Sequence, residues 1–140
     1  MTSARHALVA VAALGALALG ATACSDDDDN APTLNVRLVD FAIEANPNTV
    51  PAGNVRVKAK NDGSTEHEVV FVRTDLPEDG LPVVDNKVDE GKVEVVGEVE
   101  KFPAGKSKTA TLELPPGRYV LICNIATHYG LGMHRVLLVQ

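Results

Sequence analysis

The sequence predicts an all-β protein built as one β-sandwich domain of Greek-key type. Short runs of alternating apolar and polar residues recur along the chain, and clusters of proline, glycine and asparagine separate them. No sustained helical periodicity appears between these runs. Short strands at this spacing, without helices between them, are typical of a β-sandwich.

The first strands are expected in the first half of the domain. Residues 34–43 alternate between apolar and polar, but the parity of the alternation changes near Asp40, which predicts a bulge or bend. Residues 55–59 form a second strand with basic residues on one face. The turn sequence Asn61-Asp-Gly63 follows, so we expect this strand to pair as a hairpin with the strand over residues 66–72.

The second half is expected to hold a long loop and four strands. Residues 75–91 are rich in acidic residues, proline and glycine, which predicts an exposed loop. A strand over residues 93–99 has its alternation interrupted by Gly97. The last three predicted strands cover residues 106–114, 119–123 and 135–139.

The N-terminal residues are interpreted as an export signal. Arg5 and His6 form a short basic start, residues 7–19 are apolar, and small residues precede Cys24. The apolar stretch is short for a membrane span, and the acidic run that follows lacks stop-transfer basic residues. We therefore expect residues 1–23 to be removed.

Cys24 is a predicted lipidation site. The run Leu19-Gly-Ala-Thr-Ala-Cys24 resembles the lipobox of bacterial lipoproteins, which are cut before the cysteine and lipidated on it. The resemblance implies an exported protein anchored to a membrane through lipidated Cys24, at the cell surface or in the periplasm. Ordinary secretory cleavage at the same bond is the alternative.

The expected mature protein is an acidic tether, residues 24–32, followed by one domain, residues 33–140. Losing Arg5 leaves 12 basic against 19 acidic residues, a net charge of −7. Nucleic acid and anionic lipid surfaces are therefore not expected as partners, and we expect a monomer. The acidic block at residues 25–30 is interpreted as a solvated tether rather than a calcium site, since no spaced ligand loop accompanies it.

A metal-ligand pattern lies near the C-terminus. Cys123, His128 and Met133 fall within eleven residues, directly after a predicted strand. A thiolate, imidazoles and a weak thioether are what a trigonal His2Cys copper site with an axial methionine requires. His67 can supply the second imidazole, because alternation places it on the strand face of Val69 and Phe71. If Cys24 is lipidated, Cys123 is the remaining thiol and has no disulfide partner.

Each of these residues also has a structural interpretation. Cys123 is compatible with a small buried hydrophobe, Met133 with core packing, and His67 with a strand histidine bonded to a neighbouring glutamate. The glycines around Met133 favour a tight loop over a strand. His134 is not expected to be a ligand, because His67 and His128 already supply two imidazoles.

These residues resemble the cupredoxins, the small blue copper proteins. The run from Gly117 to Cys123, then His128, Met133 and a closing strand, is similar to the C-terminal half of that fold, and the resemblance covers nearly all of residues 33–140. The Cys-x4-His-x4-Met spacing is most similar to the auracyanin and sulfocyanin type. The resemblance implies one type 1 copper per chain, with His67, Cys123 and His128 as equatorial ligands and Met133 as the axial one.

Some positions depart from the family pattern. Glu66 stands where many members have asparagine before the first histidine, and Asn124 stands where serine or threonine follows the cysteine. Ala126-Thr127 replaces the proline that often precedes the second histidine. Such differences tune potential and affinity rather than deciding whether metal binds. The resemblance also implies an apolar docking surface at residues 129–131, for which an exposed loop tip is the alternative.

Three function classes follow from this pattern. The first is a one-electron carrier that serves redox partner proteins outside the cytoplasm, and the second is a copper-binding protein for delivery or storage at the cell envelope. An enzyme is not expected, because copper oxidases need further histidine clusters and the mature chain has three histidines. The complete ligand set favours the carrier.

Overall fold

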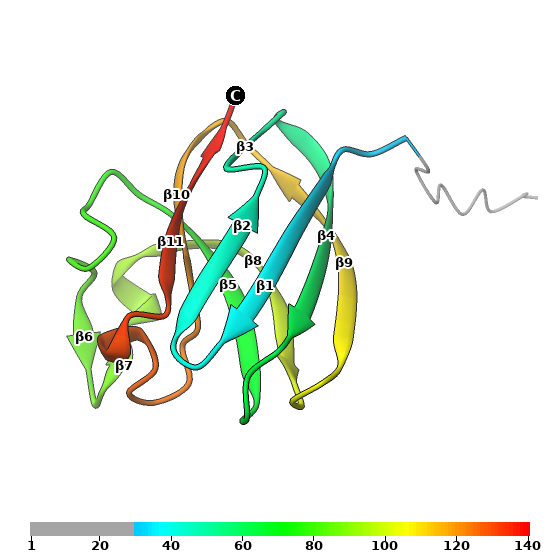
Figure 1. Ribbon diagram of the computed structural model, residues 1–140. Coiled ribbons are helices and arrows are strands. Elements are labelled where there is room, and N and C mark those ends of the chain that lie inside the picture. Colours follow the sequence, from blue (N-terminus) through cyan, green and yellow to red (C-terminus); the bar gives the residue numbers. More distant parts are fainter. Residues whose placement is uncertain (1–29) are drawn as a thin grey trace, which may run out of the picture.

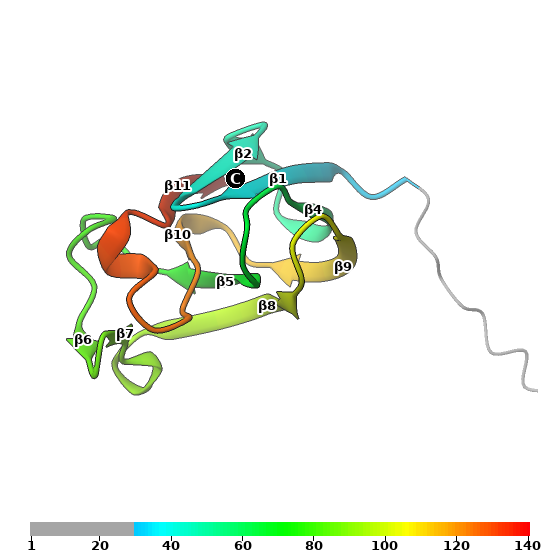
Figure 2. The same cartoon turned by 60° about the horizontal axis from the view of Figure 1, so that its bottom comes forward.

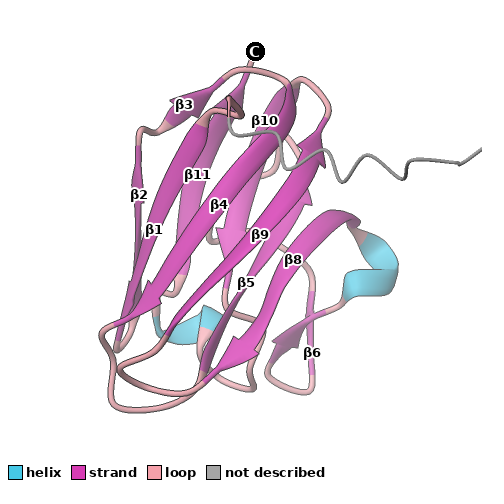
Figure 3. Cartoon of the chain, turned by 90° about the vertical axis from the view of Figure 1, so that its right-hand side faces the viewer, coloured by secondary structure: helices cyan, strands magenta, loops and turns pink. Residues whose placement is uncertain are grey.

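The computed structural model describes residues 30–140, which form two β-sheets packed face to face (Figure 1; Figure 3). The predicted export signal, Cys24 and most of the acidic tether lie outside the described residues. Within the described part of the chain, no helix is long and apolar enough to cross a membrane.

Four strands make the first sheet, in the order β2-β1-β4-β9. β1 and β4 run parallel, and the other neighbours are antiparallel. The strands are β1 Thr33–Val39, β2 Ala42–Asn46, β4 Gly53–Asn61 and β9 Ser107–Leu114.

Five strands make the second sheet, in the order β3-β11-β10-β5-β8. Here the short pair of β3 and β11 is parallel, and the rest is antiparallel. The strands are β3 Thr49–Val50, β5 His67–Arg73, β8 Glu94–Phe102, β10 Gly117–Ile122 and β11 His134–Val139. The β-sandwich predicted from the sequence is confirmed.

The core lies between the two sheets. Every second residue of the long strands points inward, and these residues form one buried cluster that extends from Leu34 in β1 to Val139 in β11. Cys123 and Met133 belong to the same cluster, so the candidate ligands lie at the edge of the main core.

The parity change near Asp40 marks a hairpin turn, so of the predicted bulge or bend, the bulge is wrong and the bend is a full reversal of the chain. β1 and β2 pair antiparallel, Leu38 faces Ile43 across the ladder, and both are buried. Asp40 and Phe41 form the two-residue turn between them. Because the chain reverses there, the inward positions on the two sides of the turn differ in parity.

The predicted hairpin between β4 and β5 is also wrong. β4 pairs with β1 and β9, whereas β5 pairs with β10 and β8 in the other sheet. The Asn61 side chain folds the connection, since its amide nitrogen donates to the carbonyls of Thr65 and Phe102 and its oxygen accepts from the Gly63 N–H. The inward faces of β4 and β5 therefore meet across the core, and the connection between these strands crosses from one sheet to the other.

The predicted loop at residues 75–91 contains structure. A small hairpin pairs β6 Val83–Val84 with β7 Lys87–Val88, and the 3-10 helix η1 Glu90–Lys92 follows. Leu81 and Val88 are buried in a second cluster on the outer face of the second sheet, with Val70, Val72, Val120, Ile122 and Tyr129. β5 is thus covered on both faces, which explains its unbroken apolar run.

Candidate metal centre

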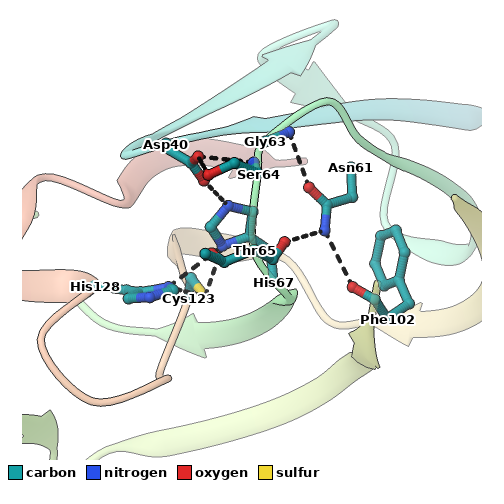
Figure 4. Close-up of polar contacts among 9 residues, drawn as sticks. All are labelled: Asp40, Asn61, Gly63, Ser64, Thr65, His67, Phe102, Cys123 and His128. Atoms are coloured by element: carbon teal, nitrogen blue, oxygen red, sulfur yellow. Dashed lines mark hydrogen bonds and ion pairs between the residues drawn. The ribbon is translucent and has the colours of Figure 1, made fainter. Parts of the chain in front are cut away.

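His67, Cys123 and His128 meet at one end of the sandwich, where β1, β4 and β10 end and β5 begins (Figure 1; Figure 4). His67 is the first residue of β5, and Cys123 directly follows β10, its neighbour in the sheet. His128 immediately precedes the 3-10 helix η2 Tyr129–Leu131. Figure 2 shows η2 at the same end as β6 and β7.

The three donor atoms form a compact triangle. Cys123 Sγ lies 3.8 Å from His67 Nδ1 and 3.4 Å from His128 Nδ1, and the two Nδ1 atoms are 3.3 Å apart. Three donors bonded at about 2.0–2.3 Å around one central metal lie about 3.5–4.0 Å from each other. The triangle therefore fits a single metal ion in trigonal coordination, and the thiolate with two imidazoles is a copper donor set.

The centre is buried and disfavours charge on its own groups. His67 and Cys123 are 0% exposed and His128 is 9% exposed. Burial raises the pKa of the Cys123 thiol. The pKa of His128 is lowered mainly by burial and, to a smaller extent, by the neighbouring His67. A thiolate at this position therefore needs a cation beside it, which a bound metal supplies.

Met133 closes the ligand loop and is fully buried in the core cluster that contains Cys123. Its carbonyl accepts a hydrogen bond from the Cys123 N–H, and its own N–H donates to the His128 carbonyl, both at 3.1 Å. Gly132 precedes it with φ of 110°, a conformation that glycine adopts readily. The loop thus carries Met133 back beside Cys123 and His128.

Asp40 was missed by sequence reasoning. Its Oδ1 lies 2.6 Å from His67 Nε2, on the side of the ring opposite the triangle (Figure 4). The Ser64 N–H donates to Oδ2 at 2.7 Å, and the Ser64 hydroxyl donates to the same oxygen. These two bonds lower the pKa of Asp40 to about 2, and the bond from the Ser64 hydroxyl has the larger effect. His67 is thus bonded to Asp40, and not to Glu66 or Glu68.

Phe41 covers the two imidazoles. Its ring lies edge-on to His128 with centroids 5.1 Å apart, and to His67 at 6.5 Å. The side chain comes from the β1–β2 turn, which the sequence interpretation treated as part of a strand. The one sequence signal for Asp40 and Phe41 was the parity change itself.

The bracing of the ligand loop differs from the family pattern at the predicted positions. Asn124 is buried and bonded to Val88, and its amide nitrogen also donates to Glu90 Oε1 at 2.6 Å. Glu66 is exposed, and Asn61 instead folds the connection before His67. Asparagine side chains therefore brace both ligand segments.

The residues after His128 separate into buried and exposed positions. Tyr129 is buried, and its hydroxyl donates to the Glu78 carbonyl and accepts from the Leu81 N–H. Leu131 is 56% exposed. His134 packs against Tyr129 and lies outside the donor triangle. Of the predicted docking residues, Tyr129 therefore belongs to the interior.

Solved structures similar to this one are cupredoxins. An auracyanin from the photosynthetic bacterium Roseiflexus castenholzii has a TM-score of 0.57 and 24% identity, over 79% of this chain and 98% of the auracyanin. Auracyanin A, a "blue" copper protein from Chloroflexus aurantiacus, has a TM-score of 0.52 and 19% identity, over 77% of this chain and 99% of the auracyanin. Rusticyanin from Thiobacillus ferrooxidans has a TM-score of 0.51 and 20% identity, over 77% of each chain. The chain therefore has the cupredoxin fold.

No family model matches the sequence, and no curated protein sequence matches it.

Proposed function

We propose that this protein is a type 1 blue copper protein that carries single electrons between redox partners outside the cytoplasm. The observation that carries the proposal is the buried triangle of Cys123 Sγ with the Nδ1 atoms of His67 and His128. The neighbouring blue copper structures share the fold and support the assignment.

The donor set supports copper over other metals. A structural zinc site is tetrahedral and typically closed by four cysteine or histidine donors, whereas this triangle has one thiolate and two imidazoles. We assign Met133 as the weak fourth ligand because its loop returns it beside Cys123 and His128. A His2Cys set with an axial thioether is the donor set of electron-transfer copper sites.

The chain holds its ligands in place before any metal binds. Bound copper supplies the one-electron chemistry by changing oxidation state. His67 begins β5 and Cys123 directly follows the paired strand β10, while Asn124 ties the following loop to β7. Because these supports are hydrogen-bonded and the site is buried, the ligands need little rearrangement between oxidation states, which favours fast electron transfer.

The surface near His128 supports contact with a redox partner. His128 is the most exposed of the three donors, and a hollow of about 260 Å³ beside it is lined by Thr127, Gly130 and Leu131 together with Val83 and Asn86. Val83 and Leu131 are more than half exposed. This apolar rim gives a redox protein a contact surface next to the most exposed of the three donor residues.

We further propose that the protein is exported, anchored through lipidated Cys24, and monomeric. The signal-like residues 1–23 and the lipobox-like run before Cys24 support the export route. An acidic tether would then separate the domain from the membrane.

Adding copper(II) to the purified apo-domain, residues 30–140, tests the copper assignment. We expect an intense blue colour that saturates at one equivalent, and a rise in melting temperature equivalent to about 4 kcal/mol at a thousandfold excess over the dissociation constant. A colourless protein with an unchanged melting curve would contradict the proposal. Slow loss of copper to a chelator supports the carrier, while rapid release would favour copper delivery or storage.

A further inference from the structure

We propose that Asp40 is a positioning residue for the copper site: it fixes the tautomer and orientation of His67 and lowers the reduction potential of the bound metal. The redox part of this inference rests on the proposed function. The tautomer part concerns the protein without metal and stands independently.

The geometry sets the tautomer of His67. Its Nδ1 faces Cys123 Sγ and His128, while its Nε2 lies 2.6 Å from Asp40 Oδ1. An ionised carboxylate only accepts hydrogen bonds, so the short contact requires the proton on Nε2. The lone pair of neutral His67 is then on Nδ1, aimed into the donor triangle, before any metal arrives.

The carboxylate is itself held in position. Ser64 donates to Asp40 Oδ2 through both its backbone N–H and its hydroxyl, leaving Oδ1 to accept from His67. Gly63 is packed against the pair, because a Cβ at this position would lie 2.6 Å from His67 Nε2 and would also meet Asp40 Oδ1. The loop before β5 thus fits around the Asp40–His67 pair and leaves no room for a side chain at Gly63.

The charge of Asp40 acts on the metal through the imidazole. The His67 side chain is 0% exposed and that of Asp40 is 24% exposed, so solvent screens this contact only in part. A carboxylate bonded to a ligating histidine raises the basicity of the ligand and stabilises the more highly charged oxidation state. Asp40 should therefore strengthen copper(II) binding more than copper(I) binding.

The Asp40→Asn variant tests the charge, and Asp62→Asn is its matched control. Asp62 belongs to the β4–β5 connection, has a side chain 25% exposed, and bonds Arg37 and Lys60 rather than a ligand. We expect Asp40→Asn to weaken copper(II) binding about tenfold relative to copper(I), which raises the reduction potential by about 59 mV. Asp62→Asn should leave the potential near that of the wild type, since the charge of Asp62 is paired with Arg37 and Lys60 and is bonded to no donor of the triangle.

An NMR measurement on the apo-protein tests the positioning. Long-range nitrogen–proton correlations should show His67 as the Nε2–H tautomer in the wild type and in Asp62→Asn, and a tautomer mixture in Asp40→Ala. An Nδ1–H tautomer in the wild type, or an unshifted potential in Asp40→Asn, would overturn the inference. If the wild type takes up no copper, the proposed function fails while the tautomer measurement still decides the role of Asp40.

Discussion

Asn124 and Val88 exchange two hydrogen bonds: the Val88 N–H donates to Asn124 Oδ1 at 2.7 Å, and Asn124 Nδ2 donates to the Val88 carbonyl at 3.1 Å. Both residues are buried. The pair joins the residue after Cys123 to β7, in the segment that covers the outer face of β5 and β10. The acidic segment at residues 75–91 is therefore part of the support of the metal centre.

The first prediction concerns this pair. Asn124→Ala should lower the free energy of unfolding by about 2–3 kcal/mol, because it leaves the buried N–H and carbonyl of Val88 without partners. Urea unfolding of the apo-domain measures this change. Asn54→Ala, at an exposed position of β4, is the control and should stay within about 0.5 kcal/mol of the wild type. Equal stability of the two variants would show that the Asn124 bonds contribute nothing.

The second prediction concerns the thiolate. Cys123→Ser should abolish the blue colour while leaving a folded β domain, because serine is nearly isosteric and lacks the sulfur that charge transfer to copper requires. Visible absorption measures the colour, and far-ultraviolet circular dichroism measures the fold. If the variant keeps an intense visible band, Cys123 is not the ligand.

The third prediction is a pH dependence of the apo-protein. The folded-state pKa of Asp40 is about 2, below its ordinary value of 3.8. The carboxylate therefore stabilises the fold above pH 3.8, and this contribution is lost as the pH falls through about 2. The stability difference between wild type and Asp40→Asn should shrink as the pH falls from 3.8 through about 2. A difference that does not change with pH would contradict the bonds from Ser64.

The candidate site was more predictable than the sheet topology. Ligand chemistry and strand alternation sufficed to select His67 and Cys123, because each is fixed by its own strand and needs no knowledge of pairing partners. The partners of β4 and β5 were not predictable from Asn61-Asp-Gly63, since a turn sequence does not show whether the chain stays in one sheet. The role of Asp40 was not predictable from the sequence, because it depends on a contact with His67, 27 positions away in the chain.

The fourth prediction separates the two export routes. Both leave Cys24 first, so the cleavage position is uninformative, but lipidation adds mass and partitions the protein into detergent. Cys24→Ala should release the protein into the aqueous phase. Mass spectrometry and detergent partitioning of the protein from its native host measure both effects. A wild type that is fully aqueous with a free Cys24 thiol would exclude the lipoprotein.

The last prediction treats Met133 as a weak, tunable ligand. Met133→Gln replaces the thioether by a harder oxygen donor, which should stabilise oxidised copper and lower the reduction potential while His67, Cys123 and His128 keep the metal bound. Fold and colour should largely survive, and electrochemical titration measures the potential.

His67→Ala and His128→Ala are the contrasting variants, because each removes a strong donor of the triangle and should weaken copper binding itself. Isothermal titration with copper(II) separates the two classes of variant. An unchanged potential in Met133→Gln would mean that Met133 is not axial. Complete loss of copper from Met133→Gln would mean that the site depends on the thioether far more than a carrier with three strong equatorial ligands allows.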